Sequence, residues 1–276
     1  MSVLFALASA VAFGISDFLG GMLSRRLSVW KVAFAMQLTA TTLLVGFSIA
    51  DPVLPTMAAV WWAVGAGSAN GIGTVSLYRG LAIGRMGVVA PVSGALAATF
   101  PVFVGVALGE RPSTWAWLGV ALALPGIWLV ARTPPTATDG SYSGLAEGLV
   151  AGANFGFLFV FLAQIPPDSG WMPLAITEGL AAVIVVVVAQ AAGQPWVPGD
   201  RELWPAVVLG VLVAGAMVAF VAATHRGYLS ISSVLSSLYP GVTVVLAILI
   251  NQERVHRAQV VGLLLCGVAV GLVATG

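Results

Sequence analysis

Charged side chains are scarce in this 276-residue chain: Asp, Glu, Lys and Arg together make up 8% of it, whereas apolar residues make up 59%. A soluble domain carries roughly 25% charged residues. A soluble fold of this composition would therefore lack the polar side chains that its surface needs. The mean hydropathy of +1.04 points the same way. The sequence predicts a protein embedded in a lipid bilayer.

Other absences narrow the function. The single cysteine, Cys266, excludes an intrachain disulfide framework. The net charge is +1 and no run of basic residues is present, so nothing indicates a nucleic-acid partner. The two histidines, His225 and His256, stand beside arginines or valines at segment ends, and neither His-Glu-x-x-His nor Gly-x-Ser-x-Gly occurs. We therefore expect no enzyme, no metal site and no cofactor.

The N-terminal apolar segment differs from a secretory signal. Basic residues, Arg25 and Arg26, follow residues 3–23 and none precedes them. A signal peptide has the opposite layout, with a basic start and a small-residue cleavage site. We therefore expect residues 3–23 to be retained as the first membrane span.

Ten apolar segments are long enough to cross the hydrocarbon core as helices, which needs about 20 residues each. Backbone groups in lipid have to pair within their own segment, so we expect helices rather than strands. The expected spans are residues 3–23, 29–50, 57–79, 86–108, 113–132, 142–163, 171–192, 203–224, 229–250 and 256–275. A polar segment rich in Pro and Thr, residues 133–141, is the expected linker between two halves.

The chain contains an internal repeat. Residues 110–130 and 253–273 align without a gap at an offset of 143, sharing an initial Glu-Arg, a glycine, a leucine and a final Leu-Val. Further matches have similar offsets: Phe13-Gly14 with Phe155-Gly156, Trp30 and Gln37 with Trp171 and Glu178, and Arg79-Gly80 with Arg226-Gly227. The alternative is a chance alignment of two Gly-rich apolar sequences. Five spans per unit would insert the second unit upside down, an arrangement typical of transporters with a midplane site.

The sequence therefore predicts an all-α integral membrane protein with ten transmembrane helices in two inverted five-helix repeats. The repeats are expected at residues 1–132 and 142–276.

Several motifs resemble a known superfamily. They are Tyr78-Arg79-Gly80-Leu81-Ala82, Pro91, Pro101-Val102, Gly109-Glu110-Arg111-Pro112, Tyr239-Pro240 and Glu253-Arg254. In this order, the chain resembles the drug/metabolite transporter superfamily, in particular proteins with two EamA-like domains. It departs from them in having Phe13-Gly14 where Trp-Gly is usual. The proline-to-glutamate spacing also differs, being thirteen residues from Pro240 but nine from Pro101, so these prolines need not be equivalent.

The resemblance implies a secondary transporter in the cell (inner or plasma) membrane, often an exporter of amino acids, other metabolites or toxic compounds. An uncoupled facilitative carrier is the alternative, and a non-transporting scaffold fits less well because the loops are short. The expected partners are a small-molecule substrate, the lipid bilayer and, for a coupled transporter, protons. A monomer and a homodimer both stay open.

Charged or amide side chains inside apolar segments are the first candidates for the transport site, because charge in hydrocarbon usually faces a cavity or a partner. Asp17 lies about fourteen residues into the first span; it is either a proton or cation ligand or an interfacial partner of Arg25 or Arg26. Glu178 and Gln37 occupy equivalent positions in the two repeats and suggest a shared cavity wall. Asn70 and Asn154 are mid-span amides that either face the cavity or join neighbouring helices.

Hydroxyls, prolines and one arginine complete the candidates. Ser233 and Ser237 are four residues apart and share a helix face, and Tyr239 follows them. Pro91 and Ser93 are their counterpart in the first half, since proline kinks a helix and frees a carbonyl. Arg79, at the end of the third span, either binds an anionic group or extends to the membrane interface. Separately, Gly144, Gly148, Gly152 and Gly156 form a stripe for close helix packing.

Two arguments about orientation disagree. If the N-terminus is outside, nine of the eleven basic residues lie at inside-facing ends, leaving only Arg111 and Arg226 on the other side. The positive-inside rule then puts both termini outside. The family resemblance implies that both termini are cytoplasmic.

Overall fold

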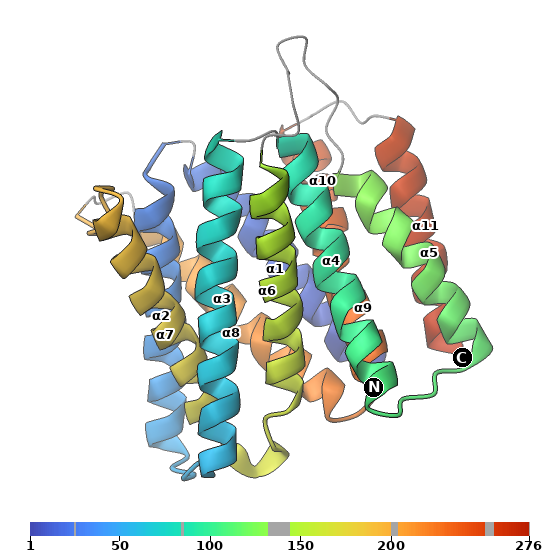
Figure 1. The fold of residues 1–276 in the computed structure, drawn as a ribbon, viewed down its shortest axis with the longest axis horizontal. Coiled ribbons are helices and arrows are strands. Elements are labelled where there is room, and N and C mark those ends of the chain that lie inside the picture. Colours follow the sequence, from blue (N-terminus) through green and yellow to red (C-terminus); the bar gives the residue numbers. More distant parts are fainter. Residues whose placement is uncertain (25, 84–85, 132–143, 200–203, 252–256, 276) are drawn as a thin grey trace.

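A computed structural model describes residues 1–24, 26–83, 86–131, 144–199, 204–251 and 257–275 of the chain (Figure 1). All regular secondary structure in these ranges is helical, with no strand, so the predicted all-α class is confirmed. The predicted linker 133–141 and the second Glu-Arg motif at Glu253 lie outside the described residues.

The helices follow the predicted segments closely. In the first half they are α1 (Ser2–Ser24), α2 (Val29–Ala50), α3 (Met57–Ile83), α4 (Met86–Ala107) and α5 (Thr114–Ala131). In the second half they are α6 (Leu145–Ala163), the 3-10 turn η1 (Pro167–Ser169), α7 (Met172–Ala191), α8 (Trp204–Thr224), α9 (Leu229–Ser236), α10 (Tyr239–Asn251) and α11 (Arg257–Thr275).

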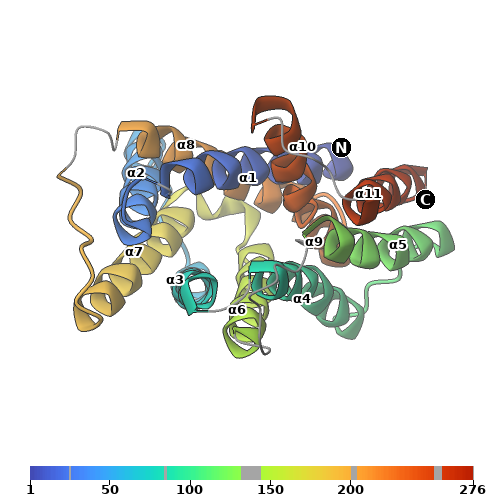
Figure 2. The same ribbon diagram turned by 90° about the horizontal axis from the view of Figure 1, so that it is seen from above.

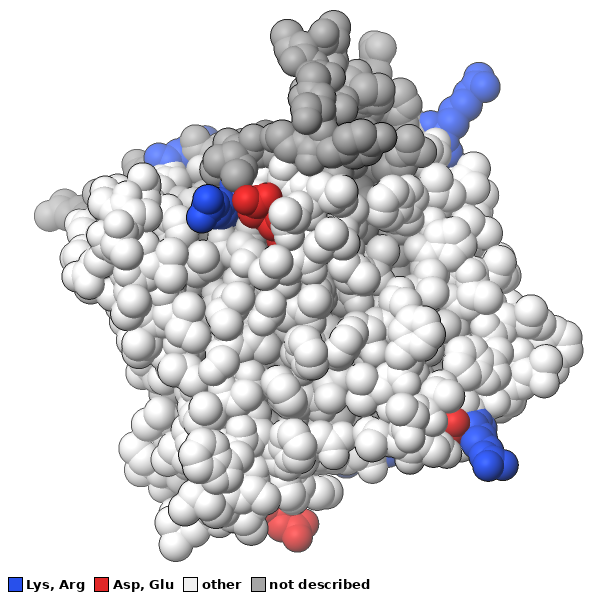
Figure 3. Space-filling model, viewed as in Figure 1, with Lys and Arg blue, Asp and Glu red and all other residues white. Residues whose placement is uncertain are grey.

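Five of these helices, α1, α2, α6, α7 and α8, are long and apolar enough to cross a membrane by length and composition. Shorter apolar stretches lie in α4, α5 and α11. The face of the molecule in Figure 3 carries its Lys, Arg, Asp and Glu side chains only near its upper and lower edges. The uncharged band between those edges is where hydrocarbon would contact the protein.

The structure corrects two predicted helix limits. Helix α3 continues to Ile83, so Arg79 lies within the helix rather than at its end. The single span expected at 229–250 is two helices, because α9 ends at Ser236 and α10 begins at Tyr239. Pro240 has no backbone N–H and cannot bond the carbonyl one turn before it, whereas it suits the first turn of a new helix.

The helices form two rows closed by a pair at each end (Figure 2). One row contains α3, α6 and α4, and the facing row contains α8, α1 and α10. Helices α2 and α7 close one end, and α5 and α11 pack on each other at the opposite end (Figure 2).

Helices of the two halves pack on each other in matching pairs. Helix α3 packs against α6 and α7, and α8 packs against α1 and α2. A glycine lies at the crossing in both cases, where a side chain would not fit. A Cβ added to Gly67 would lie 2.7 Å from the Thr177 carbonyl oxygen. A Cβ added to Gly210 would lie 2.6 Å from the Met36 carbonyl oxygen. These positions are related by the sequence repeat, so the same contact occurs twice with the halves exchanged.

The repeated tails, α5 and α11, show the same reciprocity. A Cβ on Gly119 would lie 2.9 Å from the carbonyl oxygen of Ala269, and one on Gly262 would lie 2.8 Å from that of Gly126. Gly119 thus contacts Ala269, whereas Gly126, further along α5, contacts Gly262, earlier in α11. The two tails therefore run antiparallel.

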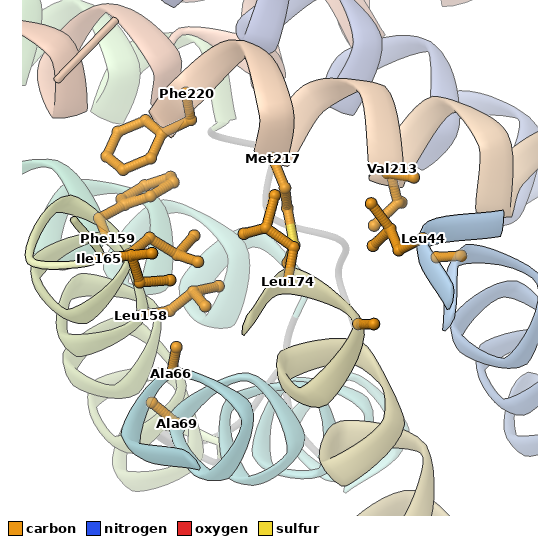
Figure 4. Close-up of a cluster of buried hydrophobic side chains, with 14 of the residues drawn as sticks. Leu44, Ala66, Ala69, Leu158, Phe159, Ile165, Leu174, Val213, Met217 and Phe220 are labelled. Carbon is orange, nitrogen blue, oxygen red and sulfur yellow. The ribbon is translucent and has the colours of Figure 1, made fainter. Parts of the chain in front are cut away.

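The largest buried cluster lies where α6 meets α8, α3 and α7 (Figure 4). Leu158 and Phe159 of α6 point toward Met217 and Phe220 of α8, with the rings of Phe159 and Phe220 4.5 Å apart. This cluster fixes the spacing between the two rows of helices and forms one wall of the cavity described next.

Candidate functional site

A cavity of about 130 Å³ lies between the two rows of helices, next to the Phe159–Phe220 cluster. Helices from both halves of the sequence line it. Its described lining residues are Phe13, Asp17, Met36, Gln37, Asn70, Thr74, Leu77, Ala97, Phe155, Leu158, Phe159, Glu178, Val213, Met217 and Tyr239. The cavity therefore combines two carboxylates, two amides and the Thr74 hydroxyl with an otherwise apolar and aromatic wall.

Glu178 is the most enclosed of the polar lining residues, with none of its surface exposed. The Asn70 amide donates a 3.0 Å hydrogen bond from α3 to one carboxylate oxygen, Oε1. The other oxygen, Oε2, has no partner in the described part of the chain. The Asn70 bond fixes the Glu178 carboxylate at the cavity wall and leaves one oxygen available to a ligand.

Gln37 lies on α2 at the position that the sequence repeat relates to Glu178. It is only 1% exposed, and neither its Oε1 nor its Nε2 atom has a hydrogen-bond partner among the described residues. A buried amide without partners costs roughly 1–3 kcal/mol. Gln37 can therefore donate a hydrogen bond from Nε2 and accept one at Oε1 when water or a ligand enters the cavity.

Asp17 of α1 retains accessible surface where it lines the cavity. Nearby, the Phe13 and Tyr239 rings meet edge to face at a centroid distance of 6.5 Å. No Lys, Arg or His occurs among the described lining residues. Asp17 therefore faces the cavity, as the first of its two predicted roles requires, and it has no basic neighbour in that wall.

Five predicted site residues line this cavity, namely Asp17, Gln37, Asn70, Glu178 and Tyr239. The structure places Arg79 elsewhere. Arg79 lines a second cavity of about 580 Å³ near the start of α2 and the end of α7. Its side chain is 71% exposed, and its Nε lies 3.8 Å from Glu147 Oε1. An exposed ion pair of this length contributes little to stability.

The remaining predicted polar residues are not among those lining the central cavity. Asn154 donates to the Val150 carbonyl of its own helix at 2.8 Å. Ser233 likewise donates to the Ser230 carbonyl at 3.1 Å, and Ser237 is buried with no partner for its hydroxyl in the described part of the chain. Ser93 is buried where α4 packs on α6. The side chain of Pro91 lies outside the described residues.

Glycines on α6 allow α4 to approach closely. A Cβ on Gly152 would lie 2.7 Å from the Ser93 carbonyl oxygen, and one on Gly156 would lie 2.7 Å from Phe100 Cβ. Gly148 meets the backbone of Val89 in the same way at 3.2 Å. Gly144 precedes the helix with a φ of 88°, a left-handed conformation that glycine adopts without strain.

Glu110 connects the halves at the end of the molecule where α9 begins. Its carboxylate accepts backbone hydrogen bonds from Leu229 N–H and, at 2.9 Å, from Ser230 N–H. These are the first two residues of α9, whose orphan N–H groups need acceptors. The Glu of the first Glu-Arg motif is therefore an N-terminal cap for a helix of the second half.

Sequence reasoning identified Tyr239 but missed the phenylalanines of the site. Phe13 and Phe155 are equivalent in the repeat, and both line the cavity with Phe159. The sequence did contain a sign of them, because a Phe-Gly pair recurs in each half, as Phe13-Gly14 and Phe155-Gly156. We interpreted that pair only as evidence of the internal repeat.

Long apolar helices around a cavity that carries a few polar side chains indicate a multi-pass membrane protein. Comparison with known proteins gives its family. The chain belongs to the EamA-like transporter family, whose model matches residues 1–132 and 142–275. The resemblance to proteins of the drug/metabolite transporter superfamily with two EamA-like domains is thereby confirmed.

A solved crystal structure with 18% sequence identity has the same fold, with a TM-score of 0.71 over 99% of this chain and 95% of that chain. Comparison with curated proteins gives no match.

Proposed function

We propose that this protein is a secondary transporter that moves a small metabolite, amino acid or drug-like compound across the cell membrane by alternating access. The observation that carries the proposal is the central cavity. It holds buried polar atoms that have no partner among the described residues, Gln37 Nε2 and Glu178 Oε2, supplied by both halves of the chain. A fully packed structural protein would gain nothing from leaving them unpaired.

The two matched segments are, in this proposal, two inverted repeats of five spans each, with α9 and α10 together forming the ninth span. The antiparallel packing of α5 on α11 supports the inversion, as do the exchanged contacts at Gly67 and Gly210. Two repeats around one cavity can rock against each other and open it to alternate sides.

We also propose coupling to protons and transport in the export direction. The support for coupling is that Asp17 and Glu178 line the cavity without a basic residue among its described lining. A proton carried by either carboxylate would compensate a charge that is costly in this environment. The export direction rests on the family resemblance.

The test is flux in proteoliposomes containing the purified full-length protein. Loaded vesicles receive a pH gradient, and efflux of candidate metabolites is followed over time. We expect gradient-driven flux for the wild type and its loss in Asp17→Asn and in Glu178→Gln. The exposed carboxylate Asp168 on η1 gives the control, Asp168→Asn, which should transport like the wild type.

Each result discriminates between mechanisms. Flux that follows only the substrate gradient would replace the coupled mechanism by a facilitative carrier. Unchanged pH-driven flux in both variants would remove Asp17 and Glu178 from the coupling step. No protein-dependent flux of any compound across the screen would favour a non-transporting role.

A further inference from the structure

We infer that the central cavity binds a small organic ammonium ion: a positively charged amine with N–H donors, a compact apolar or aromatic body and no carboxylate. The inference rests on the proposed function only in taking this cavity as the substrate site. It follows from three separate properties of the wall: its charge, its unpaired hydrogen-bonding atoms and its aromatic rings.

The first property is the sign of the charge. Asp17 and Glu178 both line the cavity, and its described lining contains no Lys, Arg or His. Glu178 is completely buried. A carboxylate in hydrocarbon is costly unless it is compensated. A cationic ligand compensates it, whereas an anionic ligand would add a third negative charge.

The second property is the balance of donors and acceptors. Among the described lining residues, the buried atoms without a partner are two acceptors, Glu178 Oε2 and Gln37 Oε1, and one donor, Gln37 Nε2. The Asn70 amide already donates to Glu178. An ammonium group has three N–H donors and no acceptor, so it matches the two open acceptors. A ligand carboxylate would find the Gln37 Nε2 donor and the Thr74 and Tyr239 hydroxyls, but beside two repelling carboxylates.

The third property is the aromatic wall. Phe13, Phe155, Phe159 and Tyr239 all line the cavity. Aromatic faces attract cations, and the attraction is strongest when the pair is desolvated. The same rings bury the apolar body of a ligand. A sugar or another polyhydroxylated compound would leave most of its hydroxyls unpaired against them.

A proton alone explains less of the site. A proton on Glu178 would neutralise one carboxylate, but it would fill none of the cavity and leave both Gln37 amide atoms unpartnered. An ammonium ligand satisfies the charge, the open acceptor of Gln37 and the aromatic rings together.

The experiment uses four compounds that share a phenylethyl body and differ in charge: phenethylamine, phenylalanine, 3-phenylpropionate and 2-phenylethanol. Binding to the purified full-length wild type is measured by titration calorimetry. We expect phenethylamine to bind at least about 10-fold more tightly than each of the other three, because a hydrogen bond to a charged group is typically worth a factor of that size. Glu178→Gln should weaken phenethylamine binding by about 10-fold or more, and Asp168→Asn should leave it unchanged.

The wild-type series decides the question even if Glu178→Gln does not fold. Equal or tighter binding of phenylalanine or 3-phenylpropionate would overturn the ammonium preference while leaving a transport role intact. No binding of any of the four compounds would also overturn it. Tight phenethylamine binding without flux in proteoliposomes would support the inference and contradict the proposed function.

Discussion

Glu110 provides the sharpest test of how the two halves are held together. Its carboxylate accepts hydrogen bonds from Leu229 N–H and Ser230 N–H at the start of α9. In Glu110→Ala both N–H groups lose their acceptor in a half-buried position. Removing an N-terminal cap costs about 0.5–2 kcal/mol, and hydrogen bonds to a charged acceptor lie at the upper end. We therefore expect a loss of about 1–2 kcal/mol.

The lone cysteine provides the assay. Cys266 is buried beside Gly126, at the contact of α5 with α11, so a thiol-reactive dye should label it only when these helices separate. A loss of 1–2 kcal/mol should lower the Tm followed with this dye by about 2–6 °C. Glu110→Gln keeps one acceptor oxygen and should lie between Glu110→Ala and the wild type.

The control is Asp168→Ala, which removes an exposed carboxylate that makes no described hydrogen bond to α9; its Tm should change by less than about 1 °C. A Tm for Glu110→Ala that matches this control would refute the capping role.

Two further predictions concern packing and topology. Gly156→Ala should lower the Tm, since its Cβ would lie 2.7 Å from Phe100 Cβ and overpacking costs about 1–3 kcal/mol; Gly46→Ala, on α2 with nothing within 4 Å, should leave it unchanged or raise it. A reporter fused to Gly276 should show periplasm-only enzyme activity if the positive-inside rule holds, and cytoplasmic fluorescence would instead favour the orientation that the family resemblance implies.

The helices could be predicted well because the apolar segments have spanning length. The break between α9 and α10 could not. The sequence between Ser236 and Tyr239 continues the apolar and hydroxyl residues of the flanking helices. Proline does not resolve the matter, because it can lie within a helix or begin a new one. Pro101 and Pro125 lie inside α4 and α5 without ending them, whereas Pro240 begins a new helix. Whether a proline kinks or breaks a helix depends on what its neighbours pack against.

The site could be predicted in part. Asp17, Gln37, Asn70 and Glu178 were identifiable because charge and amides are costly in an apolar segment, and all four line the cavity; their role in binding stays a prediction. Ser233 and Asn154 misled because each can bond a carbonyl of its own helix. A side chain that is satisfied by its own helix can lie against lipid or another helix as well as in a cavity. Its polarity alone therefore does not identify it as a site residue.

The duplicated contacts and the unequal side chains have different roles. Gly67 and Gly210 make the same backbone crossing twice, and a wall with perfect two-fold symmetry would offer every ligand two equivalent poses. Unequal side chains remove that degeneracy: Gln37 occupies the position equivalent to Glu178, and Asp17 adds a second carboxylate from α1. Glu178→Gln removes one of the two carboxylates and makes this pair of equivalent positions alike, while leaving both glycine crossings and an acceptor for Asn70 in place. We therefore expect it to change ligand affinity and charge preference much more than the Tm, which would separate the binding chemistry from the repeated scaffold.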